Sequence, residues 1–250
     1  MRKTMTFVLT GCLLIILSFS PFLISGTANK VCNSILSNKA VLSDSAVHDA
    51  AFSETSVLYD SLQLQPIGLS KQAFEYALKG YKNLQKKGLL VRKDILSICD
   101  FSQSSKNKRL YIIDVEHQKL LLNTYVAHGK NSGSEYANSF SNNPESLKSS
   151  LGFYVTRNTY YGGHGLSLRI DGLEKGFNDK ADKRNIVVHG SDYVGAGFLR
   201  YNAFSGRSFG CPAVPANQIP VVINTIKDGS CLFIYHPTKN YLTRSTLLNA

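Results

Sequence analysis

The sequence predicts a mainly β domain over residues 95–240, preceded by a linker and helical segment over 29–94 and followed by a tail over 241–250. From about Ile95 onward the chain is a series of short runs rich in β-branched and aromatic residues, which turn-forming residues separate. Ahead of these runs, one stretch carries apolar residues at helical spacing. Of the 250 residues, 43% are hydrophobic and 18% are charged, so the chain is globular and can build a sizeable core.

Residues 1–28 have the layout of a secretory signal peptide. Two basic residues precede an apolar run over 7–24, and Gly26-Thr27-Ala28 supplies small residues for cleavage. The alternative is an uncleaved anchor, because the run approaches the roughly 18 residues that suggest a membrane span. The protein would then stay associated with the inner membrane. Pro21 and the small residues after it favour cleavage, so we expect an exported protein.

The first clear element is a helix that Ser70 can cap and that Gly88 ends. Its apolar positions are Phe74, Ala77, Leu78, Tyr81 and Leu84.

Six runs predict the strands of the β domain, and the turn around VEHQK predicts a hairpin within the second run. A late helix is expected around residues 219–226, with Pro220 confined to its first turn and Gly229 as its terminator. The six runs are DILSICDFS, KRLYIIDVEHQKLLLNTYVAHG, SLGFYVTRNTYYGG, LSLRIDGLE, RNIVVHGS and SCLFIYHP.

The charge and the spacing of the cysteines argue against three classes: nucleic-acid-binding proteins, metalloproteins and disulfide scaffolds. A formal net charge of +11 attracts polyanions, but no nucleic-acid-binding motif accompanies it, so we expect no nucleic-acid partner. No ligand spacing predicts a metal site. The cysteines beyond the signal are too dispersed for a disulfide scaffold. Cys99 and Cys231 lie in apolar runs and are expected in the core; a disulfide between them stays open.

Two stretches carry the candidate chemistry, GRSFGCPAVP with Cys211 and IVVHGS with His189. A nucleophilic cysteine needs a base, a tight exposed backbone and donors for the oxyanion. His189 follows an apolar run that would end at a sheet rim, and Gly210 permits a close backbone approach to Cys211. From these residues alone, a structural thiol and a rim histidine are equally good readings.

The two motifs, read as VVHGSDYV followed by GRSFGCPAVP, resemble the signature of L,D-transpeptidase catalytic domains of the YkuD type. The likeness covers roughly Arg109 to Pro237 and includes AHGKNSGSEYANSFSNNPESLKSSLGFYVT, YYGGHGLSLRIDGLEKGFND and ADKRNIVVHG, as in murein L,D-transpeptidase catalytic domains. Phe209 stands where the usual motif has a histidine. Pro212-Ala213-Val214 occupy the places where an arginine often follows the cysteine.

The resemblance implies a β-sandwich or mixed sheet with a short helix, and a cysteine enzyme without cofactor or metal. Cys211 would be the nucleophile, His189 its base and Gly190 the carbonyl that orients it. The oxyanion loop would comprise Ser208, Phe209 and Gly210. The implied substrate is a peptidoglycan stem tetrapeptide, cleaved before its terminal D-alanine, and the implied location is the periplasm or cell wall. Transfer to an amine gives a 3–3 cross-link, whereas transfer to water gives L,D-carboxypeptidase activity.

Four further residues are candidates for substrate binding: Arg207, Arg200, His164 and Tyr161. Either arginine could bind a substrate carboxylate with two hydrogen bonds in place of the missing motif arginine. His164 lies in a glycine-rich loop that could line a cleft. All four could equally be surface residues.

Three other functional classes are alternatives to this interpretation. Papain-like and P60-type peptidases have cysteine before histidine, the reverse of His189 and Cys211. A sortase needs an arginine on a following strand, and only Arg244 follows Cys211 here. A non-catalytic cell-wall-binding module would not require the pair at all.

Overall fold

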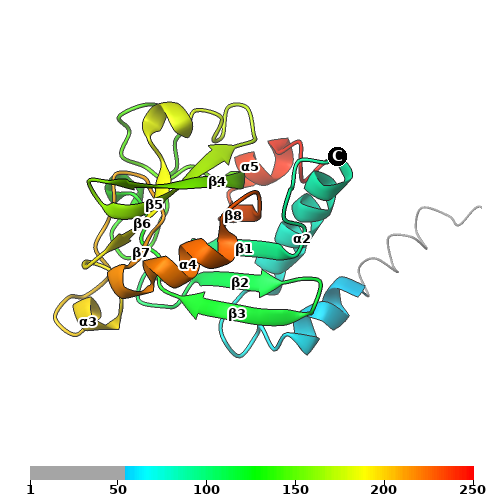
Figure 1. The fold of residues 1–250 in the computed structure, drawn as a ribbon, viewed down its shortest axis with the longest axis horizontal. Helices are drawn as coiled ribbons and strands as arrows, with labels where there is room; N and C mark the ends of the chain where they lie inside the picture. Colours follow the sequence, from blue (N-terminus) through cyan, green and yellow to red (C-terminus); the bar gives the residue numbers. More distant parts are fainter. Residues whose placement is uncertain (1–53) are drawn as a thin grey trace, which may run out of the picture. The chain divides into compact units, whose positions relative to one another are not determined.

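A computed structural model describes residues 54–250 of the chain (Figure 1). Its first long helix, α2 (Lys71–Lys86), begins where the sequence predicts, because the Ser70 side chain accepts a hydrogen bond of 3.1 Å from the N–H of Ala73. All five predicted apolar positions are buried. The helix packs on the sheet through this face, as a helix with one apolar stripe must.

Eight strands form one mixed sheet in the order β3-β2-β1-β8-β4-β5-β6-β7. The pairs β1–β8 and β6–β7 are parallel, and the other neighbours are antiparallel. This confirms the mainly β fold with a mixed sheet, and the hairpin predicted around VEHQK is β2–β3. The strands are β1 (Ile95–Asp100), β2 (Leu110–Asp114), β3 (Lys119–Thr124), β4 (Gly152–Gly162), β5 (Gly165–Gly172), β6 (Val187–Ser191), β7 (Ala213–Pro215) and β8 (Cys231–Tyr235).

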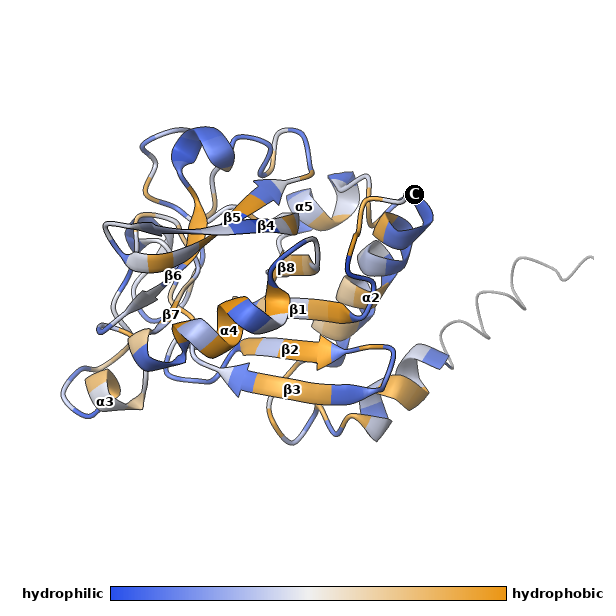
Figure 2. Ribbon diagram, in the orientation of Figure 1, coloured by the Kyte–Doolittle hydropathy of each residue, from blue (hydrophilic) through white to orange (hydrophobic). Residues whose placement is uncertain are grey.

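Helix α4 (Ile219–Ile226) lies across β1, β5 and β6 and confirms the predicted late helix, with Pro220 in its first turn (Figure 1). Its buried residues are Ile219, Val222, Ile223 and Ile226. Figure 2 shows the apolar residues gathered along α4 and the central strands, where these elements meet. The short helix α3 (Ala196–Leu199) and strand β7 have no counterpart among the predicted elements, because four and three residues are too few to show a period.

The C-terminal residues 241–250, expected as a tail, belong to the core instead. Helix α5 (Lys239–Arg244) and the turn after it bury Tyr241, Leu247 and Leu248. The side chain of Asn83 in α2 donates a hydrogen bond of 2.8 Å to the carbonyl of Leu247, and Figure 1 shows the C-terminus beside α2. Residues on both sides of the expected boundaries at 95 and 240 therefore share one hydrophobic cluster.

The cysteines of the core are free thiols. Cys99 and Cys231 are buried, as predicted, but they do not pair. In the parallel register Cys231 lies opposite Leu96, so the two cysteines are three positions out of register along adjacent strands. The expected signal peptide over 1–28 lies outside the described residues.

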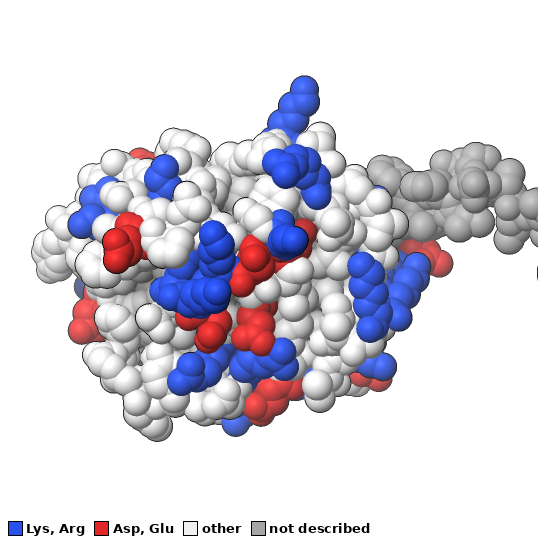
Figure 3. Space-filling model, turned by 90° about the horizontal axis from the view of Figure 1, so that it is seen from above, with Lys and Arg blue, Asp and Glu red and all other residues white. Residues whose placement is uncertain are grey.

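Charged side chains of both signs are interspersed on the face that Figure 3 shows, without a continuous basic patch. Within residues 54–250, no helix is both long and apolar enough to cross a membrane.

Candidate active site

Strand β6 holds His189 at its middle position, between Ser167 of β5 and Ala213 of β7. Its ring nitrogen Nδ1 is 2.9 Å from the carbonyl oxygen of Gly190. Because a carbonyl only accepts, this contact places the proton on Nδ1 and leaves Nε2 as the basic nitrogen. Burial lowers the pKa of His189, and the neighbouring ring of His164 lowers it further, so the imidazole is neutral at neutral pH.

Cys211 lies two residues before β7. The parallel register of β6 and β7 places Cys211 beside Val187 of β6. The N–H of Val187 points at the sulfur atom at 3.4 Å, and the thiol is 3.6 Å from the carbonyl oxygen of Asn185. Burial raises the pKa of the Cys211 thiol, although the Val187 N–H and the charge of Arg184 act in the opposite direction. The thiol therefore rests in its neutral form beside the strand that carries His189.

The loop before Cys211 is held by Ser208. The hydroxyl of Ser208 donates to the carbonyl of Cys211 at 2.6 Å and accepts the N–H of Gly210 at 3.0 Å. Gly210 has φ +127°, and a Cβ there would lie 2.8 Å from the carbonyl oxygen of Lys148. This position therefore requires glycine, both for its backbone angle and for the space around it.

A buried pair of basic residues stands behind this loop. Arg109 is fully buried and its Nη2 lies 2.7 Å from Nδ1 of His128, whose carbonyl accepts the N–H of Ser208 at 3.0 Å. Since a guanidinium only donates, Nδ1 accepts, and Nε2–H donates to Gly133 at 3.3 Å. Burial, with the charge of Arg109, lowers the pKa of His128 to about 3. The pair was not predicted, because His128 reads as an ordinary strand-end residue.

Two of the four substrate-binding candidates lie at the tip of the β4–β5 hairpin. His164 stacks on His189 with ring centroids 4.2 Å apart and an angle of 18° between the rings. Tyr161 is 83% exposed on the same hairpin. The hairpin thus brings His164 to the candidate base, and it holds Tyr161 out in solvent.

The two arginine candidates are placed differently. Arg207 is exposed, and its Nη1 donates to the carbonyl of Gly133 at 3.1 Å, so it braces the loop beside the nucleophile. Arg200 is exposed at the end of α3. Phe209 is 68% exposed next to Cys211, and Lys130 Nζ lies 5.4 Å from the centre of its ring.

A small pocket of about 140 Å³ adjoins the thiol, because Asn185 and Val187 both line it and contact the sulfur. Arg169 and Asp182 bring one charge of each sign to its wall. A groove of about 560 Å³, lined among others by Ser191 and Asp192, follows the other end of β6.

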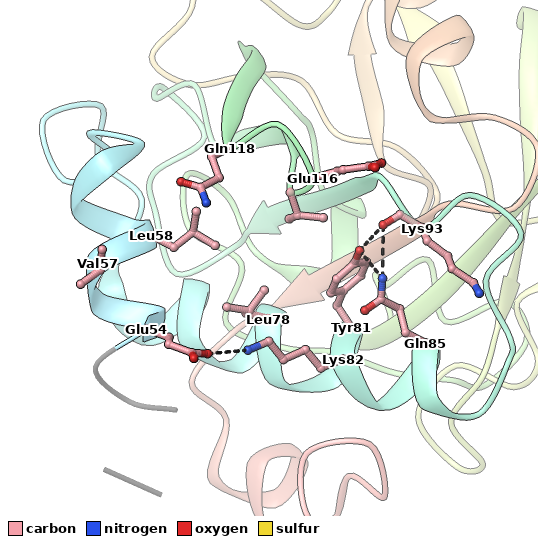
Figure 4. A pocket seen from close by; sticks show the side chains of 11 residues that line it. Glu54, Val57, Leu58, Leu78, Tyr81, Lys82, Gln85, Lys93, Glu116 and Gln118 are labelled. Atoms are coloured by element: carbon pink, nitrogen blue, oxygen red, sulfur yellow. Dashed lines mark hydrogen bonds and ion pairs between the residues drawn. The ribbon is translucent and has the colours of Figure 1, made fainter. Parts of the chain in front are cut away.

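A larger pocket, about 710 Å³, lies elsewhere. Helix α2 and the β2–β3 turn line it, and Figure 4 shows Tyr81 and Glu116 among its residues. It contains none of the candidate site residues. Within the described part of the chain, no group of histidine, cysteine and acidic side chains could hold a metal ion.

Solved structures with partly similar shape include an L,D-transpeptidase from Mycobacterium smegmatis, with 10% identity, TM-score 0.35, and 57% of this chain and 59% of that chain covered. Another, from Mycobacterium tuberculosis, has 11% identity, TM-score 0.34, and coverage of 57% and 58%. The helical cell shape determining protein Pgp2 from Campylobacter jejuni has 16% identity, TM-score 0.37, and coverage of 66% and 56%. The chain thus spans less than two thirds of these proteins, and such partial likenesses carry no argument of their own.

No curated protein matches the sequence. The family model of the L,D-transpeptidase catalytic domain, in contrast, matches residues 66–235. This range includes the whole sheet, the nucleophile loop and the histidine strand, and it begins just before α2. The chain therefore belongs to the L,D-transpeptidase catalytic domain family.

Proposed function

We propose that the protein is an exported peptidoglycan L,D-transpeptidase, acting in the periplasm or cell wall, with Cys211 as nucleophile and His189 as base. One observation carries the proposal. The Nδ1–H of His189 is bound by the Gly190 carbonyl, which leaves Nε2 as the free base, and the Cys211 sulfur contacts the same strand two residues earlier, at Val187. A structural thiol would have no need of an oriented imidazole on the neighbouring strand.

The reaction follows from these positions. Nε2 of His189 takes the thiol proton as the sulfur attacks the carbonyl carbon before the terminal D-alanine of a stem tetrapeptide. The carbon–nitrogen bond then breaks, the amine of D-alanine leaves with the proton from His189, and a thioester on Cys211 remains. An amine from a neighbouring stem attacks the thioester carbon and gives its proton to His189. The new amide bond forms, the carbon–sulfur bond breaks, and His189 returns the proton to the sulfur of Cys211.

Within residues 54–250, the N–H groups of Phe209 and Cys211 have no acceptor, so both are free donors in the loop. The N–H of Gly210 is already bound to Ser208. We assign Cys211 N–H as the principal donor for the oxyanion, since it belongs to the nucleophile itself, with Ser208 and Gly210 fixing its direction and the exposed ring of Phe209 covering the site.

The pockets at the two ends of β6 suit the stem peptide that is cleaved and the stem peptide that accepts the acyl group. The diamino acid before the scissile bond would place its side chain near Arg169 and Asp182, beside the thiol. The groove at Ser191 and Asp192 gives an acceptor room, and Asp192 and Lys108 bring one charge of each sign to its wall, which suits an acceptor that carries both an amine and a carboxylate. His164, Tyr161, Arg207 and Arg200 remain proposed contacts for the stem peptides.

The test is mass spectrometry of residues 29–250 incubated with disaccharide-tetrapeptide, beside Cys211→Ala. We expect a 3–3 linked dimer from the unmodified protein and none from the variant, with circular dichroism showing that both are folded. Cys99→Ala is the matched control, because that thiol is buried in the core, and it should keep activity. Tripeptide without dimer would identify an L,D-carboxypeptidase. A protein that neither turns over substrate nor forms a thioester would instead be a cell-wall-binding module.

A further inference from the structure

Arg184 is a cation beside the nucleophile loop that the proposed reaction leaves without a role. It ends the 3-10 turn Asp182–Arg184 and is half-buried. Both of its terminal nitrogen atoms bind the loop over residues 141–150. The acceptors are the carbonyls of Ser141 (2.9 Å) and Lys148 (2.6 Å) and the hydroxyls of Ser146 (3.2 Å) and Ser150.

All four acceptors are neutral, so they orient the guanidinium without cancelling its charge. Within residues 54–250, none of the ion pairs includes Arg184. A charge that is partly removed from water is normally paired, because leaving it unpaired costs free energy. Burial accordingly lowers the pKa of Arg184. An unpaired, oriented cation of this kind is suited to an anion that forms only during a reaction.

The group nearby that can become such an anion is Cys211. Nη2 of Arg184 lies 3.2 Å from the point that a Cβ on Gly210 would occupy, directly before the nucleophile. The residues that contact the sulfur atom, Asn185 and Val187, follow Arg184 in the chain. The left-handed conformation of Asn185, with φ +53°, turns the chain between Arg184 and β6.

The other titratable groups around this pair are neutral or exposed. Tyr154 of β4 faces Arg184 and Tyr193 faces Cys211, and burial raises the pKa of both hydroxyls. His189 lies further along β6, and Asp182 and Lys183 are exposed in the same turn as Arg184.

We propose that Arg184 is the electrostatic partner of Cys211 and stabilises the negative charge on its sulfur atom after the proton has moved to His189. It does so while anchoring loop 141–150, whose Lys148 carbonyl lies against Gly210. The inference rests on the proposed function only in taking Cys211 as the reacting thiol. Arg184 would thus supply the positive charge near the nucleophile. The usual motif often has an arginine after the cysteine, and here Pro212-Ala213-Val214 occupy those places.

The experiment measures how fast iodoacetamide alkylates Cys211 as a function of pH, with peptide mass spectrometry as the readout. Within residues 54–250, Cys99 and Cys231 are buried and Cys211 is the thiol that should react. The peptide readout separates its alkylation from that of Cys12 and Cys32. For Arg184→Gln we expect a higher apparent thiol pKa and roughly tenfold slower alkylation at pH 7.5. Arg184→Lys keeps the charge and should lie between that variant and the unmodified protein. Lys183→Gln removes the same charge from an exposed neighbour and should change nothing.

The proposal is overturned if Cys211 of Arg184→Gln is alkylated with the pH profile of the unmodified protein, even when activity is lost. Arg184 would then only anchor loop 141–150. If Arg184→Gln does not fold, Arg184→Met, which also removes the charge, decides, and an unshifted profile for that variant counts against the proposal. A shifted profile in a protein that never turns over tetrapeptide would keep the inference and reject the proposed function.

Discussion

At the scale of single residues, the nucleophile loop depends on Gly210. Replacement by alanine forces a positive φ of about +127° on a residue with a side chain and pushes its Cβ against the Lys148 carbonyl. The loop must shift, and Cys211 moves with it. Because a displacement of about 1 Å at a reacting atom can cost roughly a hundredfold in rate, we expect a loss of that order in kcat for Gly210→Ala.

Steady-state kinetics on tetrapeptide measures this loss, and Gly176→Ala is the matched control. Gly176 also has a positive φ, +84°, but nothing lies within 4 Å of the Cβ that it would gain. That variant should lose about 1 kcal/mol of unfolding free energy and keep its kcat. Equal kcat values for Gly210→Ala and the unmodified protein would show that the loop tolerates the shift.

Sequence reasoning could propose only those site residues that belong to a local motif. Cys211, His189 and Gly210 stand in short contiguous signals, and the structure places them at neighbouring positions on β6 and before β7. It could not reach Arg184 or Arg109, because each is a single arginine whose partners are 34 to 43 and 6 to 19 positions away in the sequence. Only the folded chain brings such distant partners together.

At the scale of elements, helix α2 contains a glycine that helix propensity disfavours but that core packing requires. Gly80 weakens the predicted helix, since glycine is a poor helix former, and Gly80→Ala would stabilise an isolated helix. In the protein, a Cβ on Gly80 would lie 2.0 Å from the ring of Phe153, which is stacked on Phe233 at 4.1 Å. We therefore expect Gly80→Ala to lower the unfolding free energy by about 1–3 kcal/mol, as overpacking of a filled core does.

Urea unfolding followed by circular dichroism checks this prediction, with Lys79→Ala as the control. Lys79 directly precedes Gly80 in the same helix and is exposed, so its replacement should leave stability within about 0.5 kcal/mol of the unmodified protein. A Gly80→Ala protein that is more stable than the unmodified one would mean that the Phe153 ring moves aside freely.

The elements that sequence reasoning found are those with a repeating pattern. The apolar residues of α2 and α4 recur with a helical period, and the longer strands are rich in β-branched and aromatic residues. Strand β7 has three residues and exists because β6 offers it a parallel partner. The last ten residues contain Tyr241, Leu242, Leu247 and Leu248, but the segment is too short to show a clear period. Tyr241 and Leu248 are buried by contacts with the rest of the folded chain.

At the scale of the whole molecule, buried ionisable groups link the stability of the fold to pH. His128 is held neutral, with a pKa of about 3 in the folded protein against about 6.5 for an unperturbed histidine. The unfolded chain therefore binds more protons between these values, so the stabilising contribution is complete above pH 6.5 and is lost as the pH falls. The loss approaches about 1.4 kcal/mol per pH unit, or roughly 2 kcal/mol between pH 6 and pH 4.

His128→Asn removes this titration, because an amide can accept from Arg109 but does not gain a proton in this range. The variant should be less stable at pH 7 and should lose stability less steeply than the unmodified protein as the pH falls, as measured by urea unfolding at pH 4, 5, 6 and 7. His117 is the matched control, because it is exposed and its hydrogen bond to Asp114 raises its pKa. The stability that it contributes is present at low pH and lost as the pH rises, so His117→Asn should not flatten the acid-side fall. If the unfolding free energy of His128→Asn falls as steeply with pH as that of the unmodified protein, the pair of Arg109 and His128 does not control stability in acid. Another buried group then does.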